Sequence, residues 1–146
     1  MLYTKAMNEI TWIDIEDFCK QKMEEGTYLD YKRDFPQQLE KTISAMANTL
    51  GGLILVGVAE DSENRPVDPI DGIPFKRGLS ERVMNIILTN ITPPVFPEIA
   101  VCKDPGGDKA VIAIRIPQSH QAPHAIAGNR HVYLRTGNRN SPRDSQ

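Results

Sequence analysis

The sequence predicts an α+β fold, a mixed-sheet α/β arrangement in which three helices pack on a β-sheet of about five to six strands. Segments with apolar residues at helical spacing alternate with short apolar or alternating segments. Residues 28–59 follow the order strand, helix, strand, which predicts a crossover, right-handed if the strands are parallel. Residues 95–116 contain two strand-like runs joined by Asp104-Pro105-Gly106-Gly107-Asp108, which predicts a hairpin in the C-terminal half.

The first helix and the first strand are predicted from capping and from alternation. Thr11 followed by Asp14 is typical of a capping box, and apolar residues recur behind it at helical spacing until Glu24. Gly26 ends this segment. Residues 28–33 then alternate in character between two faces, which predicts a strand.

A second helix and a buried strand follow. Pro36 suits the first position of a helix, and an apolar stripe behind it extends to Leu50. Gly51 and Gly52 close this helix, because glycine adopts the left-handed conformation at low cost. Residues 53–58 form a short continuous apolar run, whose length favours a central strand over a helix.

The C-terminal half is predicted to contain a loop, a helix and three more strands. Residues 60–74 are polar and rich in Asp and Pro, which indicates a loop. Ser80 begins a third helix, and Pro93-Pro94 stops it. The remaining segments are expected to be strands 95–103, 109–116 and 131–135, a basic irregular loop 118–130 and a frayed polar tail from Thr136. We therefore expect one domain over residues 1–140 and a flexible tail over residues 141–146.

Composition excludes several classes of protein. The chain has 146 residues, of which 40% are hydrophobic and 25% charged, values typical of soluble globular proteins rather than disordered or fibrous ones. Its apolar runs are far shorter than the roughly 20 residues of a membrane span, so we expect no membrane association. Residues 1–9 lack the features of a signal peptide. Cys19 and Cys102 show no metal-ligand spacing, so we expect core thiols in a reducing cytoplasm.

Charge is distributed unevenly along the chain. Residues 1–102 hold 10 Lys and Arg against 16 Asp and Glu, a net charge of −6. Residues 103–146 hold 7 against 3, a net charge of +4, and five of the seven are arginines. A basic segment of this kind can mark a surface that binds a polyanion.

Two clusters could carry chemistry. Glu24, Glu25 and Asp30 precede or lie in one predicted strand, and Glu60 and Asp61 follow the next. If those strands are neighbours, their carboxylates could bind Mg²⁺ or Mn²⁺, which prefer oxygen ligands; the alternative is that they are solvated charges at strand ends. In residues 120–139, arginines that could bind phosphates alternate with a tyrosine that could stack on a base; the alternative is a tyrosine packed in the sheet and arginines facing water.

The motifs together resemble the Schlafen-type, Alba-like (AlbA_2) DNA-binding domain family. The resemblance rests on Glu25 with Leu29-Asp30-Tyr31-Lys32, on residues 43–52 with their Ala-Asn-Thr-x-Gly-Gly ending, and on Val56-Gly57-Val58. Further matches in order are Pro93-Pro94, Ile116-Pro117, Pro123-His124 and Tyr133-Leu134-Arg135-Thr136-Gly137. It covers about residues 24–140.

The resemblance implies an α/β domain that binds nucleic acid and is usually fused to winged-helix or ATPase-like segments. Relatives in animals include RNA-cleaving enzymes that use three carboxylates, which map onto Glu25, Asp30 and either Glu60 or Asp61. The metal ligands would then be Glu25, Asp30 and Asp61. This sequence departs from the family at Asp30, where Glu is usual, and it offers no unique match for the third acid.

Our leading hypothesis is a nucleic-acid-binding domain, with DNA favoured over RNA, in a transcriptional regulator or a larger ATPase-like regulator. It needs no cofactor, and it allows a homodimer. The residues expected to contact nucleic acid are Lys32, Arg115, His124, Arg130, Tyr133, Arg135 and Arg139. The alternatives are an endoribonuclease that depends on Mg²⁺ or Mn²⁺, and a protein-interaction domain without either activity.

Overall fold

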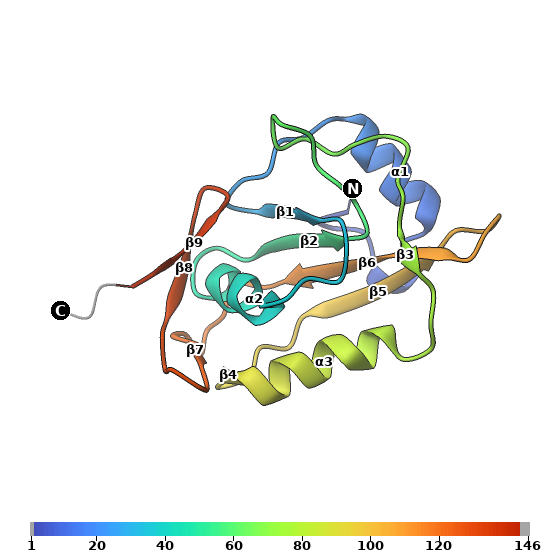
Figure 1. The fold of residues 1–146 in the computed structure, drawn as a ribbon. Helices are drawn as coiled ribbons and strands as arrows, with labels where there is room; N and C mark the ends of the chain where they lie inside the picture. The colour runs from blue at the N-terminus through green and yellow to red at the C-terminus, as the bar shows by residue number, and fades with distance from the viewer. Residues whose placement is uncertain (1, 144–146) are drawn as a thin grey trace.

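The computed structural model describes residues 2–143 of the chain, and its element order confirms the predicted α+β class (Figure 1). The elements are η1 (Met7–Glu9), α1 (Trp12–Lys20), β1 (Leu29–Lys32), α2 (Leu39–Ala47), β2 (Gly52–Val56), β3 (Ile73–Pro74), α3 (Leu79–Asn90), β4 (Ile91–Thr92), β5 (Glu98–Lys103), β6 (Lys109–Ile116), β7 (Ala125–Ile126), β8 (Tyr133–Thr136) and β9 (Arg139–Pro142).

The main sheet has five strands and mixed pairing. β1 pairs with β2, and β2 pairs with β6. β3 and β5 also pair with β6. β1 and β2 are parallel with Leu29 opposite Leu53, so the predicted strand–helix–strand crossover through α2 is confirmed. β5 and β6 are antiparallel neighbours, which confirms the predicted hairpin. Two smaller sheets, β4-β7 and β8-β9, lie beside the main sheet.

Helices cover both faces of the main sheet (Figure 1). Along β2, Leu53 and Leu55 pack in one apolar cluster with α1, whereas Ile54 and Val56 pack in a second cluster with α2 and α3. This follows from the period of two in a strand, which sends successive side chains to opposite faces. β2 is therefore a central strand buried on both sides, as its continuous apolar run predicted.

Several predicted boundaries differ from the structure. α1 ends at Lys20 rather than Glu24, because Lys22 takes a left-handed backbone conformation with φ of 54° that breaks the helix. α2 begins at Leu39 rather than Pro36. The predicted loop 60–74 ends in the short strand β3, which pairs with the start of β6.

The predicted frayed tail from Thr136 is wrong for residues 136–142, because β9 pairs with β8 there. Polar composition suggested fraying, but Asn140 donates its side-chain amide to Thr42 Oγ1 at 2.9 Å and so attaches β9 to α2. Residues 144–146 of the predicted tail lie outside the described residues.

The remaining structural expectations concern the cysteines and the helices. Cys19 and Cys102 are free and buried, which confirms them as core thiols, and burial raises the pKa of Cys19 to about 12. Among residues 2–143, every helix is too short or too polar to cross a bilayer.

Candidate nucleic-acid interface and carboxylate cluster

Three carboxylates come together beside β1. Glu25 precedes β1, Asp30 lies within it, and Glu60 follows β2. The Glu25 N–H donates to the Asn64 carbonyl at 2.8 Å, which holds the loop after β2 against the start of β1. Glu25 Oε2 in turn accepts the Tyr31 N–H at 2.8 Å. The parallel pairing of β1 and β2 brings acids from two distant segments near one another.

The environment of Glu25 changes its protonation. The pKa of Glu25 is raised from 4.5 to about 8, chiefly by burial and also by the neighbouring carboxyls of Asp30 and Glu60, while the hydrogen bond from Tyr31 opposes the shift. A carboxyl with this pKa carries a proton at neutral pH. Glu25 is thus protonated beside the carboxyls of Asp30 and Glu60.

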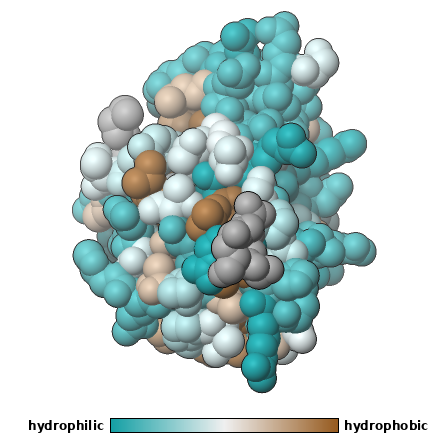
Figure 2. Space-filling model, turned by 90° about the vertical axis from the view of Figure 1, so that its left-hand side faces the viewer, coloured by the Kyte–Doolittle hydropathy of each residue, from teal (hydrophilic) through white to brown (hydrophobic). Residues whose placement is uncertain are grey.

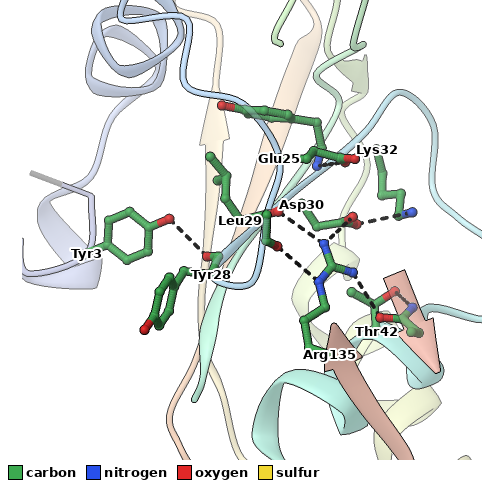
Figure 3. A network of polar contacts seen from close by, with 11 residues as sticks. Tyr3, Glu25, Tyr28, Leu29, Asp30, Lys32, Thr42 and Arg135 are labelled. Carbon is green, nitrogen blue, oxygen red and sulfur yellow. Dashed lines mark hydrogen bonds and ion pairs between the residues drawn. The ribbon is translucent and has the colours of Figure 1, made fainter. Parts of the chain in front are cut away.

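Asp30 is buried between two cations (Figure 3). Its carboxylate Oδ1 lies 3.1 Å from Arg135 Nη2, and Oδ2 lies 3.2 Å from Lys32 Nζ. The side chains of Asp30 and Arg135 are only 2% and 1% exposed. The Lys32 contact is an ion pair without hydrogen-bond geometry, so Oδ2 has no hydrogen-bond partner within residues 2–143.

Arg135 is fully engaged inside the protein. Its guanidinium donates to the carbonyl oxygens of Gly26 and Leu29 at 3.2 Å each, and to Asn140 Oδ1 at 2.9 Å. Figure 3 shows it reaching from β8 toward β1, with Thr42 of α2 on its other side. The buried carboxylate and carbonyls satisfy the guanidinium, so Arg135 holds the β8–β9 hairpin to the edge of the main sheet.

The structure places Glu60, rather than Asp61, beside Glu25. Asp61 is exposed, and its Oδ1 accepts the N–H groups of Glu63 and Arg65 at 2.8 and 3.1 Å. The bonds from Arg65 and Glu63 lower the pKa of Asp61. Within the described part of the chain, no three His, Cys, Asp or Glu side chains are placed so that they could hold a metal ion. The predicted ligand set of Glu25, Asp30 and Asp61 is therefore not assembled, because Asp61 caps its own loop.

Two more of the residues predicted to contact nucleic acid, Arg115 and Tyr133, are mostly enclosed. Arg115 donates to the carbonyl oxygens of Leu2 and Lys5 at 3.0 and 2.7 Å, and it pairs with Glu98 at 2.9 Å. Tyr133 is 8% exposed and packs against α2. Arg115 thus fastens the N-terminal segment to β6, and Tyr133 belongs to the core, as the alternative interpretation had it.

His124 was also predicted to contact nucleic acid, but it is only 1% exposed. Its Nδ1 lies 2.6 Å from the Pro93 carbonyl oxygen, and its Nε2 lies 2.5 Å from Ser119 Oγ. Its main chain is held by Asn48, which accepts the His124 N–H at 2.7 Å and donates to the His124 carbonyl at 3.0 Å. His124 therefore links the segment after α3 to the loop after β6.

The exposed cations of the C-terminal third lie on and beside the β8–β9 hairpin. Because Asn140 points inward to Arg135, the alternate residues Arg139 and Arg143 point outward on β9 and its extension. Both are exposed, as is Arg130 in the preceding loop. Figure 2 faces this end of the molecule, which is largely hydrophilic with a few apolar patches. Lys32, Arg130 and Arg139 remain candidate contacts, and Arg143 joins them.

Sequence reasoning missed several residues that build this end of the molecule. Asn48 donates to the Tyr133 carbonyl at 2.9 Å as well as binding His124, and Thr49 Oγ1 accepts the Arg135 N–H at 2.9 Å. Near the end of α2, Thr49 Oγ1 also donates to the Ala45 carbonyl at 2.8 Å. The Ala-Asn-Thr-x-Gly-Gly block, residues 47–52, thus holds the C-terminal third against the end of α2, and we call these residues the clasp.

Arg143 was missed, although the period of two in a strand places it on the same outward face as Arg139, opposite the inward Asn140. That pattern could be used only once residues 139–143 were recognised as a strand. The polar character of the segment hid the strand.

Comparisons with known proteins give the family. The sequence model described as Schlafen, AlbA_2 matches residues 25–144. No curated protein sequence matches the chain at a significant level. The N-terminal domain of a RecG-related protein from Nitrosomonas europaea has a similar structure, with a TM-score of 0.60 and 18% identity over 87% of this chain and 88% of that one.

A protein from Corynebacterium diphtheriae is also similar, with a TM-score of 0.56 and 18% identity. That match covers 89% of this chain but only 26% of the longer one. At these identities the two structures support the fold, and the family rests on the sequence match. That match extends over most of the chain and includes both the clasp and the hairpin, so the protein belongs to the Schlafen, AlbA_2 family.

Proposed function

We propose that this domain binds nucleic acid, and that it contacts phosphates through the outward face of the β8–β9 hairpin and the loop before it. The observation that carries the proposal is charge. No Asp or Glu occurs between Lys109 and Arg143. With Arg115 and Arg135 paired internally, the arginines left exposed in this stretch are Arg130, Arg139 and Arg143. Such a surface attracts a polyanion and releases its counterions on binding.

Family membership and the structural neighbour support the same function. The Nitrosomonas europaea protein is named as related to an ATP-dependent DNA helicase, and the similar part is its N-terminal domain. We therefore propose DNA, in preference to RNA, as the ligand. We further propose a cytoplasmic regulator as the setting, either a transcriptional regulator or a larger ATPase-like protein.

Removal of the outward arginines tests the proposal. We expect Arg139→Ala/Arg143→Ala to weaken binding of fluorescein-labelled DNA and to reduce the log–log salt slope by about 1.8 on duplex, or about 1.4 on single strands. The matched control is Lys76→Ala/Arg77→Ala, which removes two exposed cations at the other end of the molecule in Figure 1. Equal affinities for the two double variants, measured by fluorescence anisotropy, would contradict the proposed surface.

Metal-dependent RNA cleavage is the second candidate function. The meeting of Glu25, Asp30 and Glu60 favours it, as does the buried Asp30 Oδ2 without a hydrogen-bond partner among the described residues. The donor set as placed does not fit a divalent cation, because Arg135 and Lys32 already neutralise Asp30. We therefore rank it below nucleic-acid binding.

A thermal-shift titration with Mn²⁺ separates the two candidates. Nuclease function requires that millimolar Mn²⁺ stabilise the parent protein and leave Glu25→Gln unaffected, together with cleavage of labelled RNA. An unchanged melting temperature in both proteins, with intact RNA, would leave binding as the function.

A further inference from the structure

A hollow of about 380 Å³ lies beyond the end of β6. One wall is formed by residues 94–96, before β5, and the other by residues 117–121, after β6. Phe96 in the first wall is 65% exposed, more than any other large apolar side chain among the described residues. His120 in the second wall is also exposed. An open aromatic ring in a hollow is a surface on which a planar group can stack.

The two walls are held in place from behind. His124 is buried and bonds the Pro93 carbonyl, next to one wall, and Ser119 Oγ, in the other. The Ser119 N–H donates to the Ala47 carbonyl at 3.0 Å, and the Gln121 N–H donates to Ser119 Oγ at 3.0 Å. The hollow is therefore preorganised, so a ligand would lose little ordering entropy on entering it.

The residues that line the hollow include no acid, and an arginine lines the next hollow along the chain. The loop that forms its second wall continues into a neighbouring hollow of about 220 Å³, lined by Pro123, Leu134 and Arg143 among others. The nearest acid along the chain is Glu98, and its carboxylate is paired with Arg115. A ligand that stacks on Phe96 would thus extend toward Arg143 without meeting an unpaired acid on this path. A planar group attached to phosphates has the chemistry that this surface complements.

We infer that this end of the molecule binds single-stranded nucleic acid, with an unpaired base stacked on Phe96 and the adjoining phosphates on Arg143 and Arg139. The inference rests on the proposed function and specifies its ligand. In a duplex the bases are stacked on one another and their faces are unavailable, so Phe96 adds affinity only for unpaired bases. Stacking of this kind depends little on sequence, because every base has a π-face.

Substitution of Phe96 tests the inference. Base–aromatic stacking contributes about 1–3 kcal/mol, so we expect Phe96→Ala to weaken binding of single-stranded oligonucleotides about 5- to 150-fold. Duplex affinity and the salt slope should remain those of the parent, because no cation is removed. Phe96→Trp should retain single-strand affinity. Phe75→Ala is the matched control, since Phe75 is 42% exposed and follows β3 at the other end of the molecule.

An oligonucleotide containing 2-aminopurine reports the stacking directly. Its emission should change when the parent or Phe75→Ala binds it, and should not change with Phe96→Ala at saturating protein. Equal loss of single-strand and duplex affinity in Phe96→Ala, or no loss in either, would overturn the inference and leave the proposed function standing. Absence of binding to any nucleic acid by the parent would overturn both.

Discussion

The Asp30–Arg135 ion pair joins residues 105 positions apart and closes the β8–β9 hairpin onto β1. Both side chains are almost fully buried, so each charge is stabilised by its partner rather than by water. A buried arginine of this kind differs from Arg139, four residues later, which points into solvent. The two arginines therefore call for opposite expectations on substitution.

Arg135→Ala should destabilise the protein by about 3–5 kcal/mol, because it leaves Asp30 buried with Lys32 as its remaining cation. Urea unfolding followed by circular dichroism measures the free energy of unfolding. Arg139→Ala is the control and should change it by less than about 0.5 kcal/mol. A loss below about 1 kcal/mol for Arg135→Ala would mean that the ion pair does not hold the hairpin.

Glu25 makes stability depend on pH. The pKa of Glu25 is about 8 in the folded protein against 4.5 for the ordinary side chain. Between these values the folded state holds a proton that the unfolded state has lost, so the free energy of unfolding falls as pH rises through this window. The full penalty applies above about pH 8 and vanishes below the unfolded pKa.

Glu25→Gln should therefore be more stable than the parent at about pH 9 and nearly equal to it at about pH 4. The Gln side-chain oxygen can still accept the Tyr31 N–H, so the contact with β1 is kept. Glu24→Gln, at the exposed neighbouring position, should follow the parent at every pH. A parent and a Glu25→Gln variant with parallel stability curves would contradict the raised pKa.

At the scale of elements, the turn from α2 to β2 requires its two glycines. Gly51 has φ of +79°, and a Cβ there would lie 2.6 Å from the Ile116 carbonyl oxygen. A Cβ on Gly52 would lie 2.9 Å from the Tyr28 carbonyl oxygen. Both clashes involve backbone, which cannot move without separating β2 from its neighbours β6 and β1.

We expect Gly51→Ala and Gly52→Ala to lower stability by more than about 1 kcal/mol each before any effect on binding appears. The control is Gly128→Ala, because a Cβ there meets nothing within 4 Å. Differential scanning fluorimetry measures the three melting temperatures. A Gly51→Ala protein that melts like the parent but fails to bind DNA would assign this turn to the binding site.

The elements differ in how far the sequence could predict them. β2 and β6 were predictable, because their apolar runs encode burial on both faces. β9 was not, since its residues are polar and its attachment depends on Asn140 meeting Thr42 and Arg135 across the fold. The same limit applies to the site. Sequence spacing placed acids at the ends of β1 and β2, but it could not reveal that Arg135 turns inward to Asp30 rather than outward.

At the scale of the whole molecule, the residues that hold the C-terminal third in place differ from the exposed residues proposed to bind nucleic acid. Helices α1, α2 and α3 cover the sheet, and the C-terminal third is fastened at its end by Asn48, His124 and Arg135. This leaves Arg130, Arg139 and Arg143 exposed on and beside the β8–β9 hairpin. A homodimer remains a prediction; β5 is an edge strand of the sheet, and sedimentation velocity would detect pairing of two copies.

The salt dependence of DNA binding by the parent protein tests the central claim most directly. Anisotropy of a labelled single-stranded oligonucleotide, measured at several salt concentrations, gives the number of phosphates neutralised. Contacts through Arg130, Arg139 and Arg143 predict a log–log slope of about −2.1. A slope near zero, or no binding at the lowest salt, would contradict the claim that this surface binds nucleic acid.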